Sequence, residues 1–90
     1  MLKVTREQNG ETITLRLEGA LAGQWVEEML RCWRELSEAH ARSTRIDLSG
    51  LTWASSEGRE LLALMYRNGA ELVAADVLMK AIVEEIVAGD

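Results

Sequence analysis

Two hydrophobic periods alternate along this chain, and their succession limits the fold more than any other feature. Residues 12–17 carry isoleucine or leucine at every second position, which is the period of a strand with one buried face. Residues 24–41 carry apolar side chains every three or four positions, which is the period of an amphipathic helix. The remaining segments predict strands at residues 4–8, 44–48 and 71–74, a helix from Ser55 or Ser56 to Asn68-Gly69, and a last helix capped by Asp76 and ending at Gly89.

The expected order of elements is β-β-α-β-α-β-α, with short connections and no proline. Asn9-Gly10 between the first two strands is a strong hairpin signal, because both residues tolerate positive φ. Strands separated by helices favour right-handed crossovers and parallel pairing. We therefore expect residues 1–90 to form one α/β domain with a small mixed β-sheet flanked by helices.

Apolar positions on the expected helices indicate which side chains enter the core. Trp25 and Trp33 lie eight residues apart on one side of the first helix, which favours packing over an interaction surface. The second helix directs Leu61, Leu62 and Met65 inward. The last helix is expected to bury Leu78, Met79, Ile82, Val83 and Ile86.

Charge and composition argue against several classes of protein. Ten basic and fifteen acidic residues give a formal charge of −5, which disfavours nucleic acid and anionic membrane surfaces as ligands. No apolar stretch has the length of a membrane span or of a signal peptide, so we expect a cytoplasmic protein without membrane insertion. Cys32 is the single cysteine, which fits a reducing compartment and argues against a zinc site.

The sequence shows no catalytic constellation. A nucleophile elbow needs glycine two residues before the serine, but Ala54 holds that place relative to Ser56. His40, the single histidine, falls at the end of the first helix, where a capping or partly buried role is the simpler interpretation. The glycine pair at positions 19 and 23 lacks the spacing of a phosphate-binding loop. We expect no enzyme and no cofactor; a small hydrolase is the least favoured alternative.

The segment from Trp53 to Gly58 is the most informative part of the sequence. Serine followed by Glu57 at the start of a helix caps backbone amides and interacts favourably with the helix dipole. Gly58 costs a helix about 0.5–1 kcal/mol relative to alanine, which suggests that another backbone or a partner approaches closely there. Trp53 is expected in a loop, either packed over the end of the sheet or exposed as a partner anchor.

Residues 47–58 read Asp-Leu-Ser-Gly-Leu-Thr-Trp-Ala-Ser-Ser-Glu-Gly and are followed by Leu61-Leu62. This run resembles, without a gap, the signature of STAS domains, whose core reads Asp-Leu-Ser-Gly-Val-x-Phe-Ile-Asp-Ser-Ser-Gly. The family is named for sulfate transporters and anti-sigma-factor antagonists. Residues 17–21 and 68–72 also resemble the family's pattern around its second and last strands. The resemblance covers residues 11–88 and implies a mixed sheet flanked by helices, in agreement with the periodicity.

The resemblance implies a protein-binding switch. In partner-switching systems, an unphosphorylated STAS protein binds an anti-sigma factor that is also a serine kinase, and phosphorylation of a serine in the Asp-Ser-Ser-Gly turn releases the complex. When the patterns are aligned, that serine falls on Glu57, while Ser55 and Ser56 take the two preceding positions. Ser56 is therefore the first candidate for phosphorylation and Ser55 the second. The expected partner-binding residues are Trp53, Ser55, Ser56, Glu57 and Gly58.

Glu57 carries a permanent charge that partly imitates phosphoserine, and two hypotheses follow. One is that the protein is locked in a phosphorylated-like state and does not bind a kinase-type anti-sigma factor. The other is that the partner has adapted to the carboxylate, for example through an arginine or a helix N-terminus. We favour the second, because a permanently inactive switch has no evident use.

The resemblance also implies a second role. STAS domains of this size serve as small cytoplasmic subunits of ATP-driven lipid transporters, and others act within stress-signalling assemblies or sulfate transporters. A transporter subunit or a signalling scaffold is therefore the alternative partner to an anti-sigma factor. A homodimer is compatible with either role.

Overall fold

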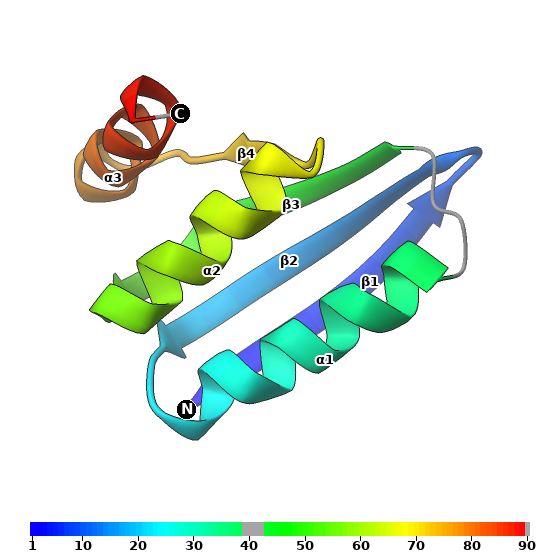
Figure 1. Ribbon diagram of the computed structural model, residues 1–90, viewed down its shortest axis with the longest axis horizontal. Helices are drawn as coiled ribbons and strands as arrows, with labels where there is room; N and C mark the ends of the chain where they lie inside the picture. Colours follow the sequence, from blue (N-terminus) through cyan, green and yellow to red (C-terminus); the bar gives the residue numbers. More distant parts are fainter. Residues whose placement is uncertain (39–42, 90) are drawn as a thin grey trace.

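One four-stranded sheet, in the order β1-β2-β3-β4, organises the structure (Figure 1). The computed structural model describes residues 1–38 and 43–89, so His40 lies outside the described residues. The predicted β-β-α-β-α-β-α order is confirmed. The elements are β1 (Leu2–Asn9), β2 (Thr12–Leu21), α1 (Gln24–Glu38), β3 (Ser43–Ala54), α2 (Ser56–Arg67), β4 (Glu71–Val73) and α3 (Val77–Ala88).

The sheet is mixed, as the sequence predicts. β1 pairs with β2 in antiparallel register, while β2, β3 and β4 are parallel neighbours. The hairpin turn lies one residue later than Asn9-Gly10, because Asn9 is the last residue of β1 and pairs with Thr12. Gly10 is the first central residue of the turn, and its φ of 64° explains why glycine suits this position.

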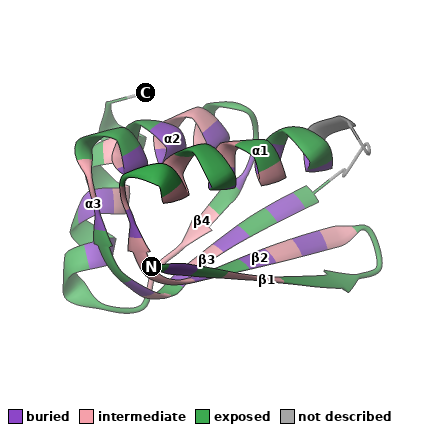
Figure 2. Cartoon of the chain, turned by 90° about the horizontal axis from the view of Figure 1, so that it is seen from below, coloured by how far each residue is buried: buried purple, intermediate pink, exposed green. Residues whose placement is uncertain are grey.

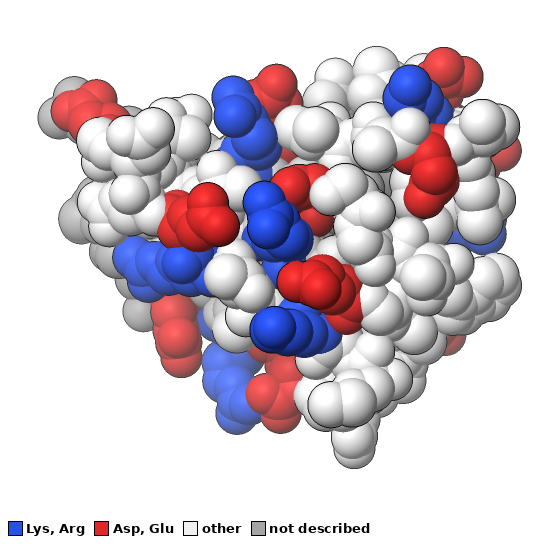
Figure 3. All heavy atoms as spheres, turned by 180° about the vertical axis from the view of Figure 1, so that it is seen from behind, with Lys and Arg blue, Asp and Glu red and all other residues white. Residues whose placement is uncertain are grey.

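Helices α1 and α2 cover the same face of the sheet (Figure 2). The two crossover connections, β2-α1-β3 and β3-α2-β4, both run in the same direction across the sheet. Because such connections are right-handed, both helices lie on the same side of the sheet. The opposite face carries charged side chains of both signs (Figure 3). Two cross-strand ion pairs lie there, Arg16 with Asp47 at 3.3 Å and Arg45 with Glu71 at 3.0 Å.

The core lies between the sheet and its helices. Ile13, Leu15 and Leu17 of β2 are buried, which confirms the strand period on which the prediction rests. Trp33 of α1 is buried and Trp25 packs against the core half-buried, so both tryptophans contribute to packing. Other fully buried side chains include Leu21, Met29, Ile46, Leu48, Leu51, Leu62, Met65 and Met79.

β3 is longer than predicted. The strand expected at residues 44–48 continues to Ala54, because β2 is also longer and pairs with it over this length. The alternation of β3 breaks at two register shifts against β2. Buried side chains therefore fall at Leu48, Leu51 and Ala54 rather than at every second position. The strand period visible in the sequence ends where the first shift begins.

α3 begins as predicted but buries a narrower surface. Asp76 caps it by accepting the Met79 backbone N–H at 2.7 Å. Met79 and Ile82 are buried, and the predicted Val83 and Ile86 are half-buried against the core. The prediction for Leu78 is wrong, since its side chain is 54% exposed. Leu78 lies about 100° around the helix from Met79, outside the side that contacts α2 and β3.

Among the described residues, no helix combines the length and apolar character that crossing a bilayer requires.

Candidate functional site: the turn between β3 and α2

The Asp47-to-Gly50 segment forms a bulge in the middle of β3. Arg16 lies opposite Asp47, but Glu18 lies opposite Gly50, so β3 advances three residues while β2 advances two. The Asp47 carboxylate accepts the Ser49 backbone N–H at 2.9 Å and the Arg16 Nε–H at 3.3 Å. Burial alone raises the pKa of Asp47, but these hydrogen bonds and the Arg16 charge outweigh burial and lower the pKa below its usual range.

Gly50 allows β3 to approach β2 closely after this bulge. A Cβ at Gly50 would lie 2.7 Å from Glu18 Cγ and 3.2 Å from the Leu17 carbonyl oxygen. The Asp-Leu-Ser-Gly motif therefore has a structural role: its aspartate holds the bulge and its glycine fits the narrow gap. Both features set the path of β3 toward the turn that follows.

The end of β3 is tied to the end of β2. Thr52 Oγ1 donates a hydrogen bond to the Gly19 carbonyl oxygen at 2.8 Å. The Ser55 backbone N–H donates to the Leu21 carbonyl oxygen at 3.0 Å. Ala54 between them is fully buried. These contacts fix where α2 begins.

Ser55 is the N-cap of α2. Its backbone is extended, with φ −70° and ψ 175°, and its Oγ accepts the Gly58 backbone N–H at 3.1 Å. The same hydroxyl donates to the Leu21 carbonyl oxygen at 3.4 Å. The half-buried Ser55 side chain is thus engaged within the protein on both its donor and acceptor sides.

Gly58 is buried against Leu21. A Cβ at this position would clash with the Leu21 carbonyl oxygen and would lie 3.1 Å from Leu21 Cγ. The close backbone approach that Gly58 suggests therefore comes from within the protein, at the end of β2. Whether Gly58 also touches a partner stays a prediction.

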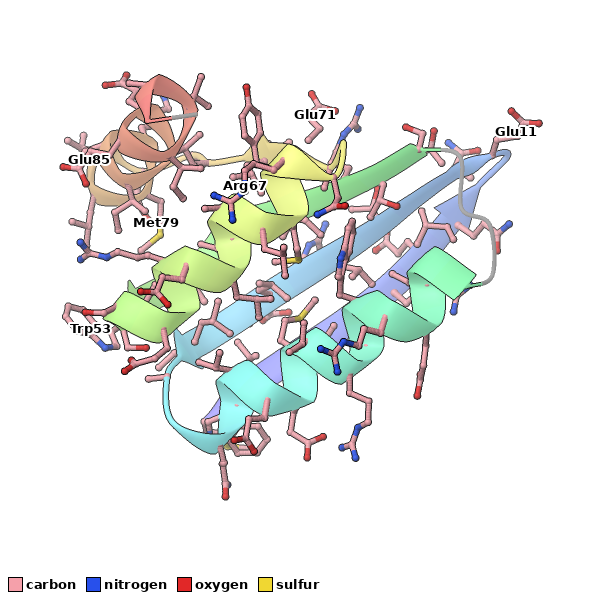
Figure 4. The ribbon with its side chains drawn as sticks, in the orientation of Figure 1. Glu11, Trp53, Arg67, Glu71, Met79 and Glu85 are labelled. Carbon is pink, nitrogen blue, oxygen red and sulfur yellow. The ribbon has the colours of Figure 1, made fainter. Side chains whose placement is uncertain are left out.

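Trp53, Ser56 and Glu57 form the exposed part of the site, which we call the turn surface. Trp53 is 52% exposed and, contrary to the expectation of a loop, is the penultimate residue of β3. Figure 4 shows its ring beside the N-terminal end of α2. Ser56 and Glu57 are exposed in the first turn of α2. Within residues 1–38 and 43–89, no hydrogen bond or ion pair engages the Glu57 carboxylate.

The structure thus divides the five predicted site residues into two groups. Ser55 and Gly58 build the turn from inside, while Trp53, Ser56 and Glu57 face outward. Sequence reasoning missed two residues that support the turn. One is Leu21, whose carbonyl oxygen accepts two hydrogen bonds from Ser55. The other is Arg59, whose Nε–H donates to the Ala54 carbonyl oxygen at 3.3 Å.

Neither residue has a sequence signal that identifies this role. Arg59 is one of several charged residues in an amphipathic helix, and Leu21 contributes through its backbone.

Replacing Ser55 with alanine is expected to lower the free energy of unfolding by about 1 kcal/mol, because the Gly58 N–H loses its capping oxygen. Ser56→Ala is the matched control one residue further, since Ser56 is exposed and makes no intramolecular side-chain hydrogen bond among the described residues. Urea denaturation followed by circular dichroism measures both values. Equal stability of the two variants would contradict the assignment of Ser55 as the cap.

The described part of the chain contains no group of three or more His, Cys, Asp or Glu side chains that could hold a metal ion. A cavity of about 210 Å³ lies between α2 and α3, lined by Ala63, Arg67, Glu85, Ile86 and Gly89. Arg67 is the last residue of α2, so this cavity lies at the far end of the helix from the turn surface.

Comparisons with known proteins identify the fold. No family model matches the sequence, and no curated protein matches it. Among solved structures, the chain resembles an anti-sigma-factor antagonist from Mycobacterium paratuberculosis, with a TM-score of 0.85 and 16% identity over 99% of this chain and 79% of that one. It also resembles the anti-sigma-factor antagonist SpoIIAA in its unphosphorylated form, with a TM-score of 0.70 and 18% identity over 93% and 82% of the two chains.

A third likeness agrees with these two. An uncharacterized protein from Shewanella loihica with a SpoIIAA-like fold matches with a TM-score of 0.58 and 17% identity, over 87% of this chain and 70% of that one. At such identities, the likeness establishes the fold and leaves function to be argued from the site. The shared architecture confirms what the Asp47-to-Gly58 resemblance implies: the chain has a STAS-like fold, the fold of the anti-sigma-factor antagonists.

Proposed function

We propose that this protein is a non-enzymatic regulator that binds a protein partner through its turn surface, in the manner of an anti-sigma-factor antagonist. Two similar structures are anti-sigma-factor antagonists, which supports a regulator of this type. The turn surface supplies the contact, because Trp53 at the end of β3 and Ser56 and Glu57 in the first turn of α2 are all exposed. Ser55 and Gly58 act by holding its shape.

The observation that carries this proposal is that Trp53, at the end of β3, and Glu57, in the first turn of α2, are both exposed and lie four residues apart. Exposed tryptophans are frequent at the energetic centre of protein interfaces. Because the Glu57 carboxylate has no hydrogen-bond or ion-pair partner among residues 1–38 and 43–89, a binding partner that contacts it displaces no contact from these residues. The partner therefore recognises Glu57 through a cation, an arginine above all, or through a helix N-terminus. This is the adapted-partner hypothesis rather than the locked state.

Phosphorylation, where it occurs, falls on Ser56 before Ser55. The Ser56 hydroxyl is exposed, whereas the Ser55 hydroxyl is half-buried and engaged in the cap. A phosphate on Ser56 adds a charge of about −1.5 to −2 next to Glu57 and releases a partner that fits a single carboxylate. With Glu57 at the position of the usual acceptor, the unmodified protein is the binding-competent form.

The second candidate function uses the same surface with another partner. A subunit of an ATP-driven lipid transporter or a cytoplasmic stress-signalling scaffold would also need an exposed anchor residue, and Trp53 supplies one. The identity of the partner separates the two functions. An anti-sigma factor with a serine kinase domain supports the first, and a transporter component supports the second.

The test begins with capture of the partner from a lysate of the source cell, its identification by mass spectrometry, and calorimetric titration with the purified partner. Glu57→Gln and Glu57→Ser are expected to weaken binding about 10- to 150-fold, which is the worth of a charge-assisted hydrogen bond of about 1.5–3 kcal/mol. Glu60→Gln is the matched control, an exposed carboxylate on the same helix, and should leave the affinity unchanged.

Three outcomes would contradict parts of the proposal. Tighter binding of Glu57→Ser would support the locked state instead. Unchanged binding of both Glu57 variants would place the contact elsewhere. Transfer of phosphate from ATP to Ser55 or Ser56 by a captured kinase, with the complex left intact, would contradict release by charge.

A further inference from the structure

The outer edge of β1 offers a second interaction surface. β1 is the first strand in the sheet order and pairs with β2 alone among the described strands. It is eight residues long, whereas β4 at the opposite edge has three. Residues 6–9 of β1 are exposed, and Figure 2 shows the strand at the border of the sheet. α1 contacts β2, the strand next to β1. A long, open edge strand is a template for pairing with another strand.

The hairpin determines which backbone groups this edge presents. Asn9 and Thr12 close a two-residue turn, so this pair exchanges both of its backbone hydrogen bonds. Hydrogen-bonded pairs then alternate along the ladder, and Lys3, Thr5 and Glu7 direct their N–H and C=O groups toward β2. The alternate residues Leu2, Val4, Arg6 and Gln8 direct theirs outward, and no strand of the described chain accepts them.

We propose that this edge binds a second copy of the chain, as an antiparallel β1–β1 pair whose twofold axis passes beside Thr5. In this register the outward groups of Val4 pair with those of Arg6 in the other copy, and those of Leu2 pair with Gln8. Lys3 then lies opposite Glu7, and the symmetry repeats this contact. A lysine on an edge strand ordinarily blocks pairing, but here each lysine meets a carboxylate.

The neighbouring registers lack this complementarity. An axis beside Arg6 places two guanidinium groups opposite each other. An axis beside Val4 places Lys3 opposite Thr5 and leaves Glu7 beyond the end of the paired strand. Registers that pair Val4 with Thr5 place backbone groups that point outward opposite backbone groups that point toward β2. Such registers cannot form the alternating hydrogen bonds of an antiparallel ladder. Only the axis beside Thr5 satisfies both the hydrogen-bond pattern and the charges.

The pairing does not depend on the turn surface. That surface follows β3, two strands from the β1 edge, so a β1–β1 dimer extends the sheet across both copies and leaves both turn surfaces accessible. The dimer therefore presents two partner-binding surfaces. Failure of the dimer would leave the proposed partner binding intact, and the reverse also holds.

Disulfide trapping tests the register. Thr5 and its copy form a non-hydrogen-bonded pair with Cα atoms about 4.5 Å apart, within the range a disulfide spans. In a Cys32→Ala background, Thr5→Cys should form a covalent dimer under mild oxidation about tenfold faster than Arg6→Cys. The two Arg6 positions are two residues out of register and beyond disulfide reach. Equal rates, or no covalent dimer from Thr5→Cys, would overturn the proposal.

Charge exchange gives an independent readout in solution. Sedimentation equilibrium should show a dimer of the wild-type chain, and Lys3→Glu or Glu7→Lys alone should raise its dissociation constant about fivefold or more. The double variant Lys3→Glu/Glu7→Lys should restore the wild-type value, because each pair is rebuilt with its signs reversed. A monomeric wild-type protein, or a double variant weaker than both single variants, would overturn the proposal.

Discussion

Trp53→Ala should weaken binding of the captured partner about 30-fold or more and leave the stability of the protein nearly unchanged. A tryptophan at the centre of an interface typically contributes at least about 2 kcal/mol on truncation, which corresponds to about 30-fold in affinity. Because the side chain is 52% exposed in the free protein, its removal opens no core cavity. Calorimetric titration measures the affinity, and urea denaturation measures the stability.

The control for this prediction is a second exposed apolar residue far from the turn surface. Val87 lies near the end of α3 and is 44% exposed, so Val87→Ala removes apolar surface without touching the proposed contact. Its affinity for the partner should match that of the wild type. Equal loss of affinity in both variants would point to a general effect, and no loss in Trp53→Ala would remove Trp53 from the interface.

Gly58→Ala should lower the free energy of unfolding by about 1–3 kcal/mol, the usual cost of adding a methyl group where there is no room for it. The direction is opposite to that of an ordinary helical position, where the same change gains about 0.5–1 kcal/mol. The difference arises because the new methyl group would clash with the Leu21 carbonyl oxygen. α2 must then shift away from the end of β2 or strain its first turn.

Urea denaturation tests this prediction, with Ser56→Ala as the exposed control in the same turn of the helix. The control should remain within about 0.5 kcal/mol of the wild type. A stability of Gly58→Ala equal to or above the wild type would show that the Leu21 contact relaxes freely. The turn surface would then not depend on the packing of α2 against β2.

Features set by local chemistry were predictable from the sequence. The alternation of Ile13, Leu15 and Leu17 predicts a one-sided strand, and the structure buries all three. Asp76 caps α3 as its side chain predicts, and α2 ends at Arg67, with Asn68 as its C-cap and Gly69 following at a φ of 98°. Each of these features depends on residues close in sequence, because a cap or a short strand period is set by local backbone and side-chain chemistry.

Features set by distant parts of the chain were not predictable. The length of β3 depends on two register shifts against β2, which break the period of its buried residues. Trp53 therefore becomes an exposed strand residue rather than part of a loop. The exposure of Leu78 depends on which side of α3 meets α2 and β3, and the amphipathic pattern was too broad to decide that.

The candidate site also has features that the sequence predicts and features that it does not. The resemblance to STAS domains marks residues 53–58 from their identities alone. It does not show that the Ser55 hydroxyl is engaged with Gly58 and Leu21 while the Ser56 hydroxyl is exposed. That difference arises where the ends of β2 and β3 meet, and residues 34 positions apart in sequence create it.

Amide hydrogen exchange of the protein, with and without its captured partner, tests the central claim most directly. If the turn surface is the binding site, the amides of residues 53–58 should exchange more slowly in the complex. Exchange of the amides on the charged face of the sheet, opposite α1 and α2, should be the same as in the free protein. Slower exchange confined to that charged face or to α3, with residues 53–58 exchanging as in the free protein, would contradict the claim.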